Sequence, residues 1–256
     1  MSCIRVLILA GKGESTRLMF NGIKDSFSVE KVIIEEPVPK KQLLTQRLKR
    51  FGLLKVIGQI LFMAYNKILL KKQSQKRINE IKHQNNLNDK NIDEAIVLKV
   101  NSVNCYETKK ILEECQPDVV VVNGTRIIKK EIIETIDAPF VNTHVGITPK
   151  YRGVHGGYWA LTENDIEHCG VTVHLIDTGI DTGGILYQDV IEITDKDTFN
   201  TYPYLQTVAA IPLMKKAVND IANKTYKTRK TDLPSRLWSH PTIMEYLKYR
   251  MLHSVK

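Results

Sequence analysis

The sequence predicts an α/β protein with a mostly parallel, Rossmann-like sheet, and three observations support this. Residues 4–10 (IRVLILA) form a short apolar run rich in β-branched residues, followed by a glycine turn and a helix starting near Thr16. Similar runs then alternate with helical stretches, and strands bounded by helices of this length are typical of parallel sheets. Two late runs, 170–177 and 185–193, are separated by a turn around which they can pair.

The middle of the chain continues this alternation. Further strands are expected at 29–36, 95–100, 118–124 and 138–145. Helical patterns cover 106–115, 129–136 and 204–223. We therefore expect one main domain over 1–200, interrupted by a basic helical insert at about 38–84. A short C-terminal helix and tail, 201–256, should pack on that domain.

The composition is that of an ordinary folded protein. The chain has 256 residues, of which 43% are hydrophobic and 25% charged. Four scattered cysteines without CxxC spacing suggest neither a disulfide framework nor a zinc knuckle: Cys3, Cys105, Cys115 and Cys169. The N-terminal apolar run suits a first strand better than a signal peptide. We therefore expect reduced thiols and a cytoplasmic location.

The positive charge of the chain is concentrated in one segment. The formal net charge is +9, but residues 40–82 hold twelve lysines and arginines against Glu80 alone, a local charge of +11. The remainder is therefore close to neutral, at −2. We do not expect the whole domain to bind nucleic acid.

The basic segment also contains an amphipathic stretch, LLKVIGQILFMAYNKILL at 53–70. Polar residues interrupt it, which argues against a membrane-spanning helix: Lys55, Gln59, Asn66 and Lys67. We favour an insert that packs on its own domain or on a second subunit in a homodimer. That interpretation predicts burial of Ile57, Leu61 and Ile68. A weak membrane-surface contact, near lipid-linked glycan assembly, and a nucleic-acid contact are the alternatives.

The first chemical cluster follows an apolar strand, in VNTHVGITPKYRGVHGG at 141–157. Asn142 and His144 are two residues apart, so in an extended chain they project to the same side. An amide and an imidazole at the carboxyl end of a strand can both donate to a developing oxyanion. A structural hydrogen bond that caps the strand is the alternative.

The second cluster lies in a glycine-rich loop, HLIDTGIDTGGILYQ at 174–188. Such a loop exposes backbone donors and lets a flat ligand approach, and its carboxylates Asp177 and Asp181 could handle a proton. An ordinary turn is the alternative. Since His174 and these carboxylates lack compact ligand spacing, we expect no metal.

Taken in order, these motifs resemble a known family. Asn-Xaa-His, Pro-Lys-Tyr-Arg-Gly, Gly-Val-Thr-Val-His and Asp-Xaa-Gly-Gly follow one another as in the 10-formyltetrahydrofolate-dependent formyltransferases. That family includes glycinamide ribonucleotide, methionyl-tRNA and nucleotide-linked amino sugar formyltransferases. The resemblance covers residues 3–200 and is thinnest across 37–92. It implies a formyltransferase-type catalytic domain over residues 1–200, with 10-formyltetrahydrofolate as co-substrate.

The resemblance also implies roles for individual residues. Asn142 and His144 would face the formyl oxygen, and Asp181 would orient a water that carries protons. In NGTRII at 123–128, the candidate pterin contacts, largely through the backbone, are Arg126, Ile127 and Ile128. Strand-to-helix packing is the alternative for these three. The other face of the pterin would be covered by Asp177, Thr178 and Gly179.

The acceptor is less well defined. The turn containing Gly11, Gly13 and Ser15 is placed like the phosphate-binding turn of the glycinamide ribonucleotide enzymes, although Glu14 weakens the match. The segment Val145 to Pro149 replaces the usual Ser-Leu-Leu-Pro, and we expect Lys150 and Arg152 to contact substrate.

We therefore expect a small primary amine as acceptor, most plausibly a nucleotide-linked amino sugar. Glycinamide ribonucleotide is the alternative, and methionyl-tRNA or plain hydrolysis of the folate is less favoured, since nothing resembling the tRNA-binding module follows the core. A nicotinamide-dependent dehydrogenase is a different class: GKGEST with Glu35 and Glu36 partly imitates its fingerprint, although Thr16 holds the third glycine position. A binding module without catalytic activity is the third class of function that we consider.

Overall fold

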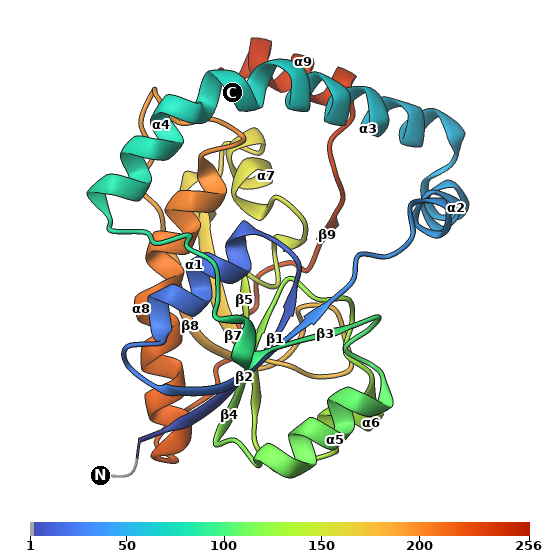
Figure 1. The fold of residues 1–256 in the computed structure, drawn as a ribbon. Helices are drawn as coiled ribbons and strands as arrows, with labels where there is room; N and C mark the ends of the chain where they lie inside the picture. The colour runs from blue at the N-terminus through green and yellow to red at the C-terminus, as the bar shows by residue number, and fades with distance from the viewer. Residues whose placement is uncertain (1–2) are drawn as a thin grey trace.

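The computed structural model describes residues 3–256 and has one large sheet covered by helices on both faces (Figure 1). The order of its seven strands is β3-β2-β1-β4-β5-β7-β8. The strands are β1 (Arg5–Gly11), β2 (Ser28–Glu35), β3 (Val97–Val100), β4 (Val119–Asn123), β5 (Phe140–His144), β7 (Gly170–Leu175) and β8 (Ile185–Val190). Strands β1 to β5 are parallel, and β7 is antiparallel to both β5 and β8. The predicted α/β class with a mostly parallel sheet is confirmed.

Helices α1 (Glu14–Ile23) and α8 (Tyr202–Ala222) cover one face of the sheet, and α5 (Tyr106–Cys115) and α6 (Lys130–Ile133) cover the other. Helices α7 (Gly156–Thr162) and α9 (Ile243–Leu252) belong to a separate core with the insert. Successive side chains of a strand point to opposite faces. Val6 and Ile8 of β1 pack with α1 and α8 on one face, whereas Leu7 and Leu9 pack with α5 and α6 on the other. Burial on both faces explains the continuous apolar run that predicted β1.

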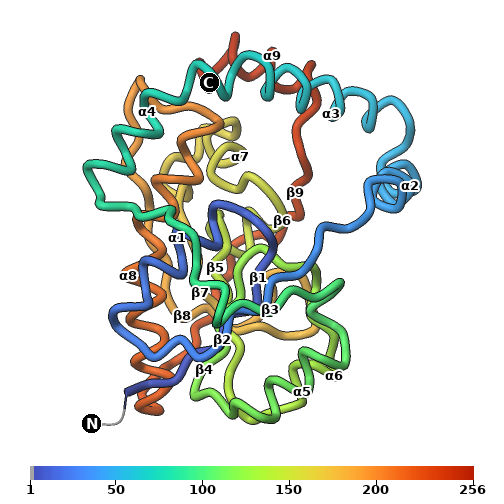
Figure 2. Tube along the Cα trace, in the orientation of Figure 1, coloured from blue at the N-terminus to red at the C-terminus, as the bar shows by residue number. Residues whose placement is uncertain are grey.

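The insert is helical and lies between β2 and β3. It consists of α2 (Lys40–Phe51), α3 (Leu53–Tyr65), a π-helical turn (Asn66–Leu70) and α4 (Lys71–Gln84). From α3 to α4 the chain forms one long helix that spans the end of the molecule above the sheet (Figure 1). Figure 2 shows that the C-terminal segment rises from the sheet to α9, which lies beside α3.

An aromatic cluster joins the insert to the C-terminal segment. The ring of Phe62 in α3 lies 5.0 Å from the rings of both Phe199 and Tyr246, measured between centroids. Gly58 allows close approach, because a Cβ there would lie 2.9 Å from Cβ of Thr242 at the start of α9. Helices α3 and α9 therefore pack on each other and on the body as a second core.

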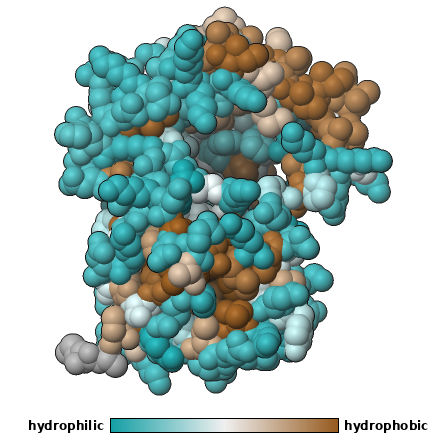
Figure 3. Space-filling view, viewed as in Figure 1, coloured by the Kyte–Doolittle hydropathy of each residue, from teal (hydrophilic) through white to brown (hydrophobic). Residues whose placement is uncertain are grey.

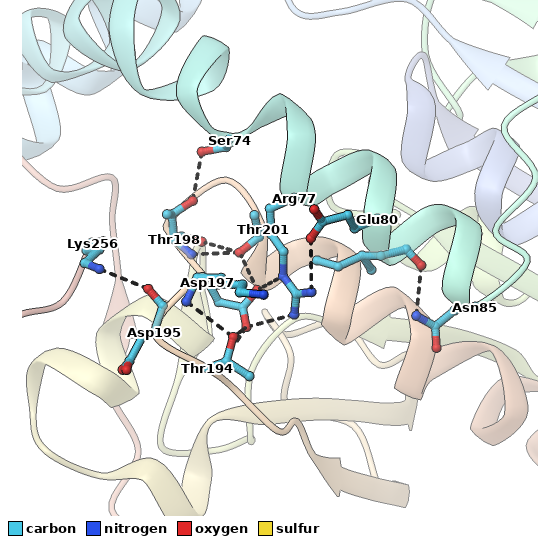
Figure 4. Close-up of polar contacts among 12 residues, drawn as sticks. Ser74, Arg77, Glu80, Asn85, Thr194, Asp195, Asp197, Thr198, Thr201 and Lys256 are labelled. Atoms are coloured by element: carbon cyan, nitrogen blue, oxygen red, sulfur yellow. Dashed lines mark hydrogen bonds and ion pairs between the residues drawn. The ribbon is translucent and has the colours of Figure 1, made fainter.

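A buried ion pair anchors the other end of the long helix (Figure 4). Arg77 of α4 donates to Asp197 from Nε to Oδ1 at 2.8 Å and from Nη2 to Oδ2 at 3.2 Å. The carboxylate also accepts from the amide and hydroxyl of Thr194, and its side chain is fully buried. Burial alone would raise the pKa of Asp197, but these hydrogen bonds outweigh it and leave the pKa below its ordinary value.

The apolar residues of α3 do not all face the body. The side chains turned inward are Val56, Gln59 and Phe62. In contrast, Ile57, Leu61 and Ile68 are 44%, 53% and 68% exposed, so the predicted burial of these three against their own domain is wrong. An amphipathic pattern gives the spacing of two faces but not which of them the body covers. By length and composition alone, the helix from Leu53 to Gln84 could also cross a membrane.

We predict that Arg77→Met lowers the free energy of unfolding by about 3 kcal/mol, because it leaves the Asp197 carboxylate buried without its cation. Chemical denaturation of the variant measures this loss. Lys76→Met is the matched control, since Lys76 is the exposed neighbour on the same helix and should change stability little. Equal effects of the two substitutions would show that the ion pair does not anchor the insert.

Candidate functional site

A cavity of about 650 Å³ lies between the sheet and the insert. Its floor is formed by the carboxyl ends of β4, β5 and the antiparallel β7, and its walls by α2, the loop after β7 and the C-terminal segment. Figure 3 shows the molecule hollowed beneath the helices of the insert. Asn142, His144 and Asp181, which the sequence predicts as catalytic, all line this cavity.

The central geometry joins His144 to Asp181. Nδ1 of His144 lies 3.3 Å from Oδ2 of Asp181, and Nε2 lies 2.7 Å from the carbonyl oxygen of Tyr151. The same Oδ2 accepts a hydrogen bond of 3.1 Å from the amide of Gly153. Both ring nitrogens thus face acceptors, so an imidazole that carries protons on both can donate to both. The arrangement holds the ring and the carboxylate in fixed relative positions.

Asn142 is oriented by a second histidine. Its Nδ2 lies 3.2 Å from Nε2 of His174, whose Nδ1 lies 2.7 Å from the carbonyl oxygen of Leu175. Nδ1 of His174 must therefore carry the proton, which makes Nε2 the acceptor for the amide of Asn142. Burial lowers the pKa of His174 and favours this neutral form. One amide hydrogen of Asn142 remains for a ligand.

Sequence reasoning considered His174 only as a metal ligand and missed this role. The signal was available in part, because the predicted strand 170–177 contains His174. The missing information was the antiparallel register, which places His174 opposite Asn142. Oδ1 of Asp181 is 3.7 Å from Nε2 of His174, so both histidines flank one carboxylate.

Two local features hold Asp181 in place. Its φ of 51° is in the left-handed region, which Asp tolerates better than most residues because its short side chain can bond locally. Gly183 allows the loop to fold onto β7, since a Cβ there would lie 1.8 Å from the carbonyl oxygen of Leu175. The glycine-rich composition of the loop is therefore a steric requirement.

The segment after β5 is shaped around His144. A Cβ at Gly146 would lie 2.9 Å from Nε2 of His144 and 2.5 Å from the carbonyl oxygen of Tyr151. Only glycine fits at this position without displacing the ring or its partner. The departure from the usual Ser-Leu-Leu-Pro segment is thus accommodated by a tight turn beside the imidazole.

The predicted pterin segment lines the same cavity, but the guanidinium of Arg126 is engaged elsewhere. It donates to the carbonyl oxygens of Glu36 and Asn101 at 2.7 and 3.0 Å, and its Nε lies 2.6 Å from Oε2 of Glu35. Arg126, Ile127 and Ile128 can therefore offer backbone atoms and the half-exposed Ile127 side chain to a flat ligand.

The contacts of Glu35 also bear on the dehydrogenase alternative. Its Oε1 accepts from the amide of Arg126 at 2.6 Å, and its Oε2 from the amide of Val103 at 3.0 Å. A nicotinamide-binding acidic residue would hold a ribose hydroxyl. Here both oxygens bind the chain itself and tie β2 to the segments after β3 and β4, so the fingerprint has a structural role.

The loop predicted to cover the other face of the pterin contributes two of its three residues. Asp177 and Gly179 line the cavity, whereas Thr178 does not. Oδ1 of Asp177 accepts from the amide of Gly179 at 2.9 Å and from the hydroxyl of Thr182 at 2.7 Å. Asp177 therefore stabilises the loop that carries Asp181.

The residues predicted to bind the acceptor are not brought together. Gly11 ends β1, Gly13 immediately precedes α1 and Ser15 lies in the first turn of α1, but none of them lines the cavity. The hydroxyl of Ser15 accepts from Asn123, at the end of β4, at 3.3 Å. Glu14 is engaged by Lys82 of the insert and by the hydroxyl of Tyr204.

Lys150 and Arg152 likewise lie outside the residues that line the cavity. Nζ of Lys150 lies 2.5 Å from Oδ2 of Asp165, and Arg152 donates to the carbonyl oxygen of Ile180 at 3.0 Å. Their cationic groups are held by the chain itself, and Arg152 supports the loop of Asp181. That these two side chains contact substrate stays a prediction.

Two other segments line the cavity in their place, and sequence reasoning missed both. Helix α2 contributes Arg47 and Arg50, and the strand β9 (Leu237–Trp238) with its following residues contributes Trp238 and His240. Strand β9 pairs with β6 (Arg152–Gly153), which places it directly beside the amide that binds Asp181. The insert thus contributes side chains to the lining of the cavity.

Comparison with known proteins agrees with this geometry. A family model described as formyl transferase matches residues 58–208, more than half of the chain. The chain belongs to the formyl transferase family. The match includes Asn142, His144, His174 and Asp181, so the resemblance inferred from the sequence motifs is confirmed.

Several relatives of this formyl transferase chain have known names. It is 36% identical over 106 residues to a methionyl-tRNA formyltransferase of Kosmotoga olearia, and 38% identical over 110 residues to that of a Nitratiruptor species. These matches cover 41% and 43% of this chain but only 34% and 35% of the relatives. The chain therefore matches about a third of the length of these curated relatives.

Solved structures share the fold at low sequence identity. A sugar N-formyltransferase from a Shewanella species aligns with a TM-score of 0.57 at 16% identity, covering 92% of this chain and 76% of that one. Glycinamide ribonucleotide transformylase 1 from Symbiobacterium toebii aligns with a TM-score of 0.55 at 16% identity, covering 93% and 95%. These likenesses establish that the formyl transferase fold extends over nearly the whole chain.

A pair of neutral histidines beside the cavity predicts sensitivity to acid. Nε2 of His155 lies 2.9 Å from Nδ1 of His240. Burial, and then the neighbouring His240, lower the pKa of His155 to about 3. Burial, and then the charge of Arg47, lower that of His240 to about 4. In the unfolded chain the pKa of each histidine would be about 6.5.

We therefore predict that stability falls as the pH drops from about 6.5 towards 4, because the unfolded chain then takes up protons that the folded chain does not. His155→Asn should reduce the slope of the free energy of unfolding against pH by up to about 1.4 kcal/mol per pH unit. Asn is chosen because the φ of residue 155 is 58°. Denaturation at several pH values measures the slope, and the exposed His83→Asn should leave it unchanged. An unchanged slope in His155→Asn would contradict the assignment.

Proposed function

We propose that this chain transfers a formyl group from 10-formyltetrahydrofolate to the primary amine of a small phosphorylated acceptor. The observation that carries the proposal is the convergence of Asn142, His144 and Asp181 in one cavity that is also lined by the segment Gly124 to Ile128. The co-substrate fits these residues, because a half-exposed Ile127 and nearby backbone groups offer a surface for a flat heterocycle.

The chain's groups suit attack by an amine on the formyl carbon. Holding both reactants in one cavity supplies proximity. As the nitrogen–carbon bond forms, the formyl oxygen becomes an oxyanion, to which the free amide hydrogen of Asn142 can donate. A His144 ring that carries protons on both nitrogens adds a positive charge beside it while its N–H groups stay on Asp181 and the carbonyl oxygen of Tyr151. The carbon–N10 bond then breaks, and the formamide and tetrahydrofolate are the products.

Proton movement is assigned to Asp181. The attacking amine loses one proton, and N10 of the leaving folate gains one, so the reaction neither consumes nor releases a proton overall. Asp181, 14% exposed and adjacent to His144, is placed to accept the amine proton through a water and return it to N10. The amide of Gly153 orients the carboxylate for that role.

Two arginines support a phosphorylated acceptor. Arg47 and Arg50 line the cavity, and within residues 3–256 neither pairs with a carboxylate. The guanidinium of Arg50 instead stacks at 5.1 Å from the ring centroid of Phe51. Arginine binds phosphate oxygens through paired donors, so an anionic group at the α2 end of the cavity would satisfy both.

Among phosphorylated amines, we favour a nucleotide-linked amino sugar over glycinamide ribonucleotide. The turn of Gly11, Gly13 and Ser15 lies outside the cavity lining, which disfavours the phosphate position of the glycinamide ribonucleotide enzymes. The arginines of α2 offer a different position for a diphosphate. Efficient turnover of glycinamide ribonucleotide, with none for nucleotide-linked 4-amino-4,6-dideoxy sugars, would reverse this preference.

We predict that His144→Ala and Asp181→Ala each lower kcat by about a hundredfold or more, because each removes a transition-state donor or the proton route. Appearance of tetrahydrofolate, with and without an added amine, measures turnover. Asp189→Ala, an exposed carboxylate outside the cavity, should leave kcat unchanged. Near-normal turnover of either site variant with intact folate binding would refute its role.

We also predict that Arg47→Gln and Arg50→Gln raise KM for the phosphorylated acceptor by about tenfold while kcat changes little, because they remove binding that is equal in ground and transition states. Lys40→Gln on the same helix removes the same charge outside the cavity and serves as the control. If Lys40→Gln raised KM as much as the arginine variants, general electrostatic attraction would explain the effect.

A further inference from the structure

One face of the molecule exposes large apolar side chains from two helices that lie side by side. From α3 and the π-helical turn these are Leu53, Leu54, Ile57, Ile60, Leu61, Ile68 and Leu69. From α9 they are Met244, Leu247, Met251 and Leu252. We call these residues the outer face. Figure 3 shows apolar atoms gathered over α3 at the upper right of the molecule.

Several individual side chains of the outer face are largely exposed to solvent. Leu54 is 86% exposed, Ile68 68% and Met251 78%. Scattered apolar residues are normal on protein surfaces, but many exposed apolar side chains on two packed helices are typical of a surface that binds a partner. Since α3 packs on α9 through Gly58 and Phe62, the two sets of side chains share one rigid support.

The opposite side of the long helix is committed to the body of the protein. Nε2 of Gln59 donates to the carbonyl oxygen of His240 at 2.8 Å, and Arg77 pairs with the buried Asp197. A helix that crossed a bilayer would have to break these contacts and place Arg77 in or near the membrane. The outer face can therefore meet a membrane only from the side, as an interfacial helix does.

The charges around the outer face identify the kind of partner. Lysines are exposed along the same helix, at Lys55, Lys67, Lys71 and Lys72, within the segment of net charge +11. In a two-fold dimer through this face the same cationic surfaces would lie near each other, which is unfavourable. An anionic lipid surface accepts both the apolar side chains and the lysines.

We propose that the outer face docks this protein on the surface of an anionic lipid bilayer. The long helix lies in the plane of the interface, with its apolar residues below the headgroups and its lysines among them. The inner side of α3 contributes Gln59 to the wall of the cavity. Docking thus places the cavity about one helix diameter, on the order of 10 Å, from the membrane surface.

The test is cosedimentation of the full chain with vesicles of phosphatidylcholine, with or without phosphatidylglycerol. We expect binding to the anionic vesicles that weakens with added salt, because lysine attraction is screened over about 8 Å at physiological ionic strength. Replacing Leu54, Leu61 and Ile68 together with Gln should lower the partition coefficient by about tenfold or more. The melting temperature of this triple variant should be unchanged, since each of the three replaced side chains is more than half exposed.

A matched control replaces two exposed apolar residues on other parts of the surface, Tyr106→Gln and Ile166→Gln. This double variant should bind vesicles as the wild type does. A wild type that ignores anionic vesicles, or a triple variant that binds them equally well, would overturn the proposal. So would a wild-type dimer in analytical ultracentrifugation that the triple variant dissociates, because a second copy would then cover the outer face.

Discussion

The site depends on one constraint: the carboxylate of Asp181 must be held between two histidines that come from different strands. Nδ1 of His144 lies 3.3 Å from one oxygen, and Nε2 of His174 lies 3.7 Å from the other. The strand β5 supplies Asn142 and His144, β7 supplies His174, and the loop after β7 returns Asp181 between them. The left-handed backbone of Asp181 and the close approach at Gly183 make that return possible.

Segments outside the large sheet also help to hold Asp181 and the walls of the cavity in place. Strand β9 pairs with β6, whose Gly153 amide binds Asp181, and the residues that follow β9 bind the insert through Gln59. The insert in turn reaches the body through Arg77 and Asp197 and places Arg47 and Arg50 at the cavity. The basic insert, whose composition differs from that of the rest of the chain, therefore forms part of the wall of the cavity.

Much of the fold and the center of the site could be predicted from the sequence, for physical reasons. The strands are buried on both faces and so appear as apolar runs, and the two-residue spacing of Asn142 and His144 places both on one side. What could not be predicted depends on long-range geometry. His174 acquires its role from the register with Asn142, Lys150 is held by Asp165, and the exposure of Leu61 depends on which face of α3 the body covers.

We propose that this cavity moves a formyl group from one nitrogen to another, and the fate of the formyl carbon is the decisive measurement. The chain would be incubated with 10-formyltetrahydrofolate labelled with carbon-13 in the formyl group, together with a nucleotide-linked amino sugar, and the products would be identified by NMR. We expect the label to appear as a formamide on the sugar nitrogen, in equal amount to tetrahydrofolate, and we expect Asp181→Asn to slow this transfer. Label recovered as free formate, at a rate independent of the amine, would contradict it.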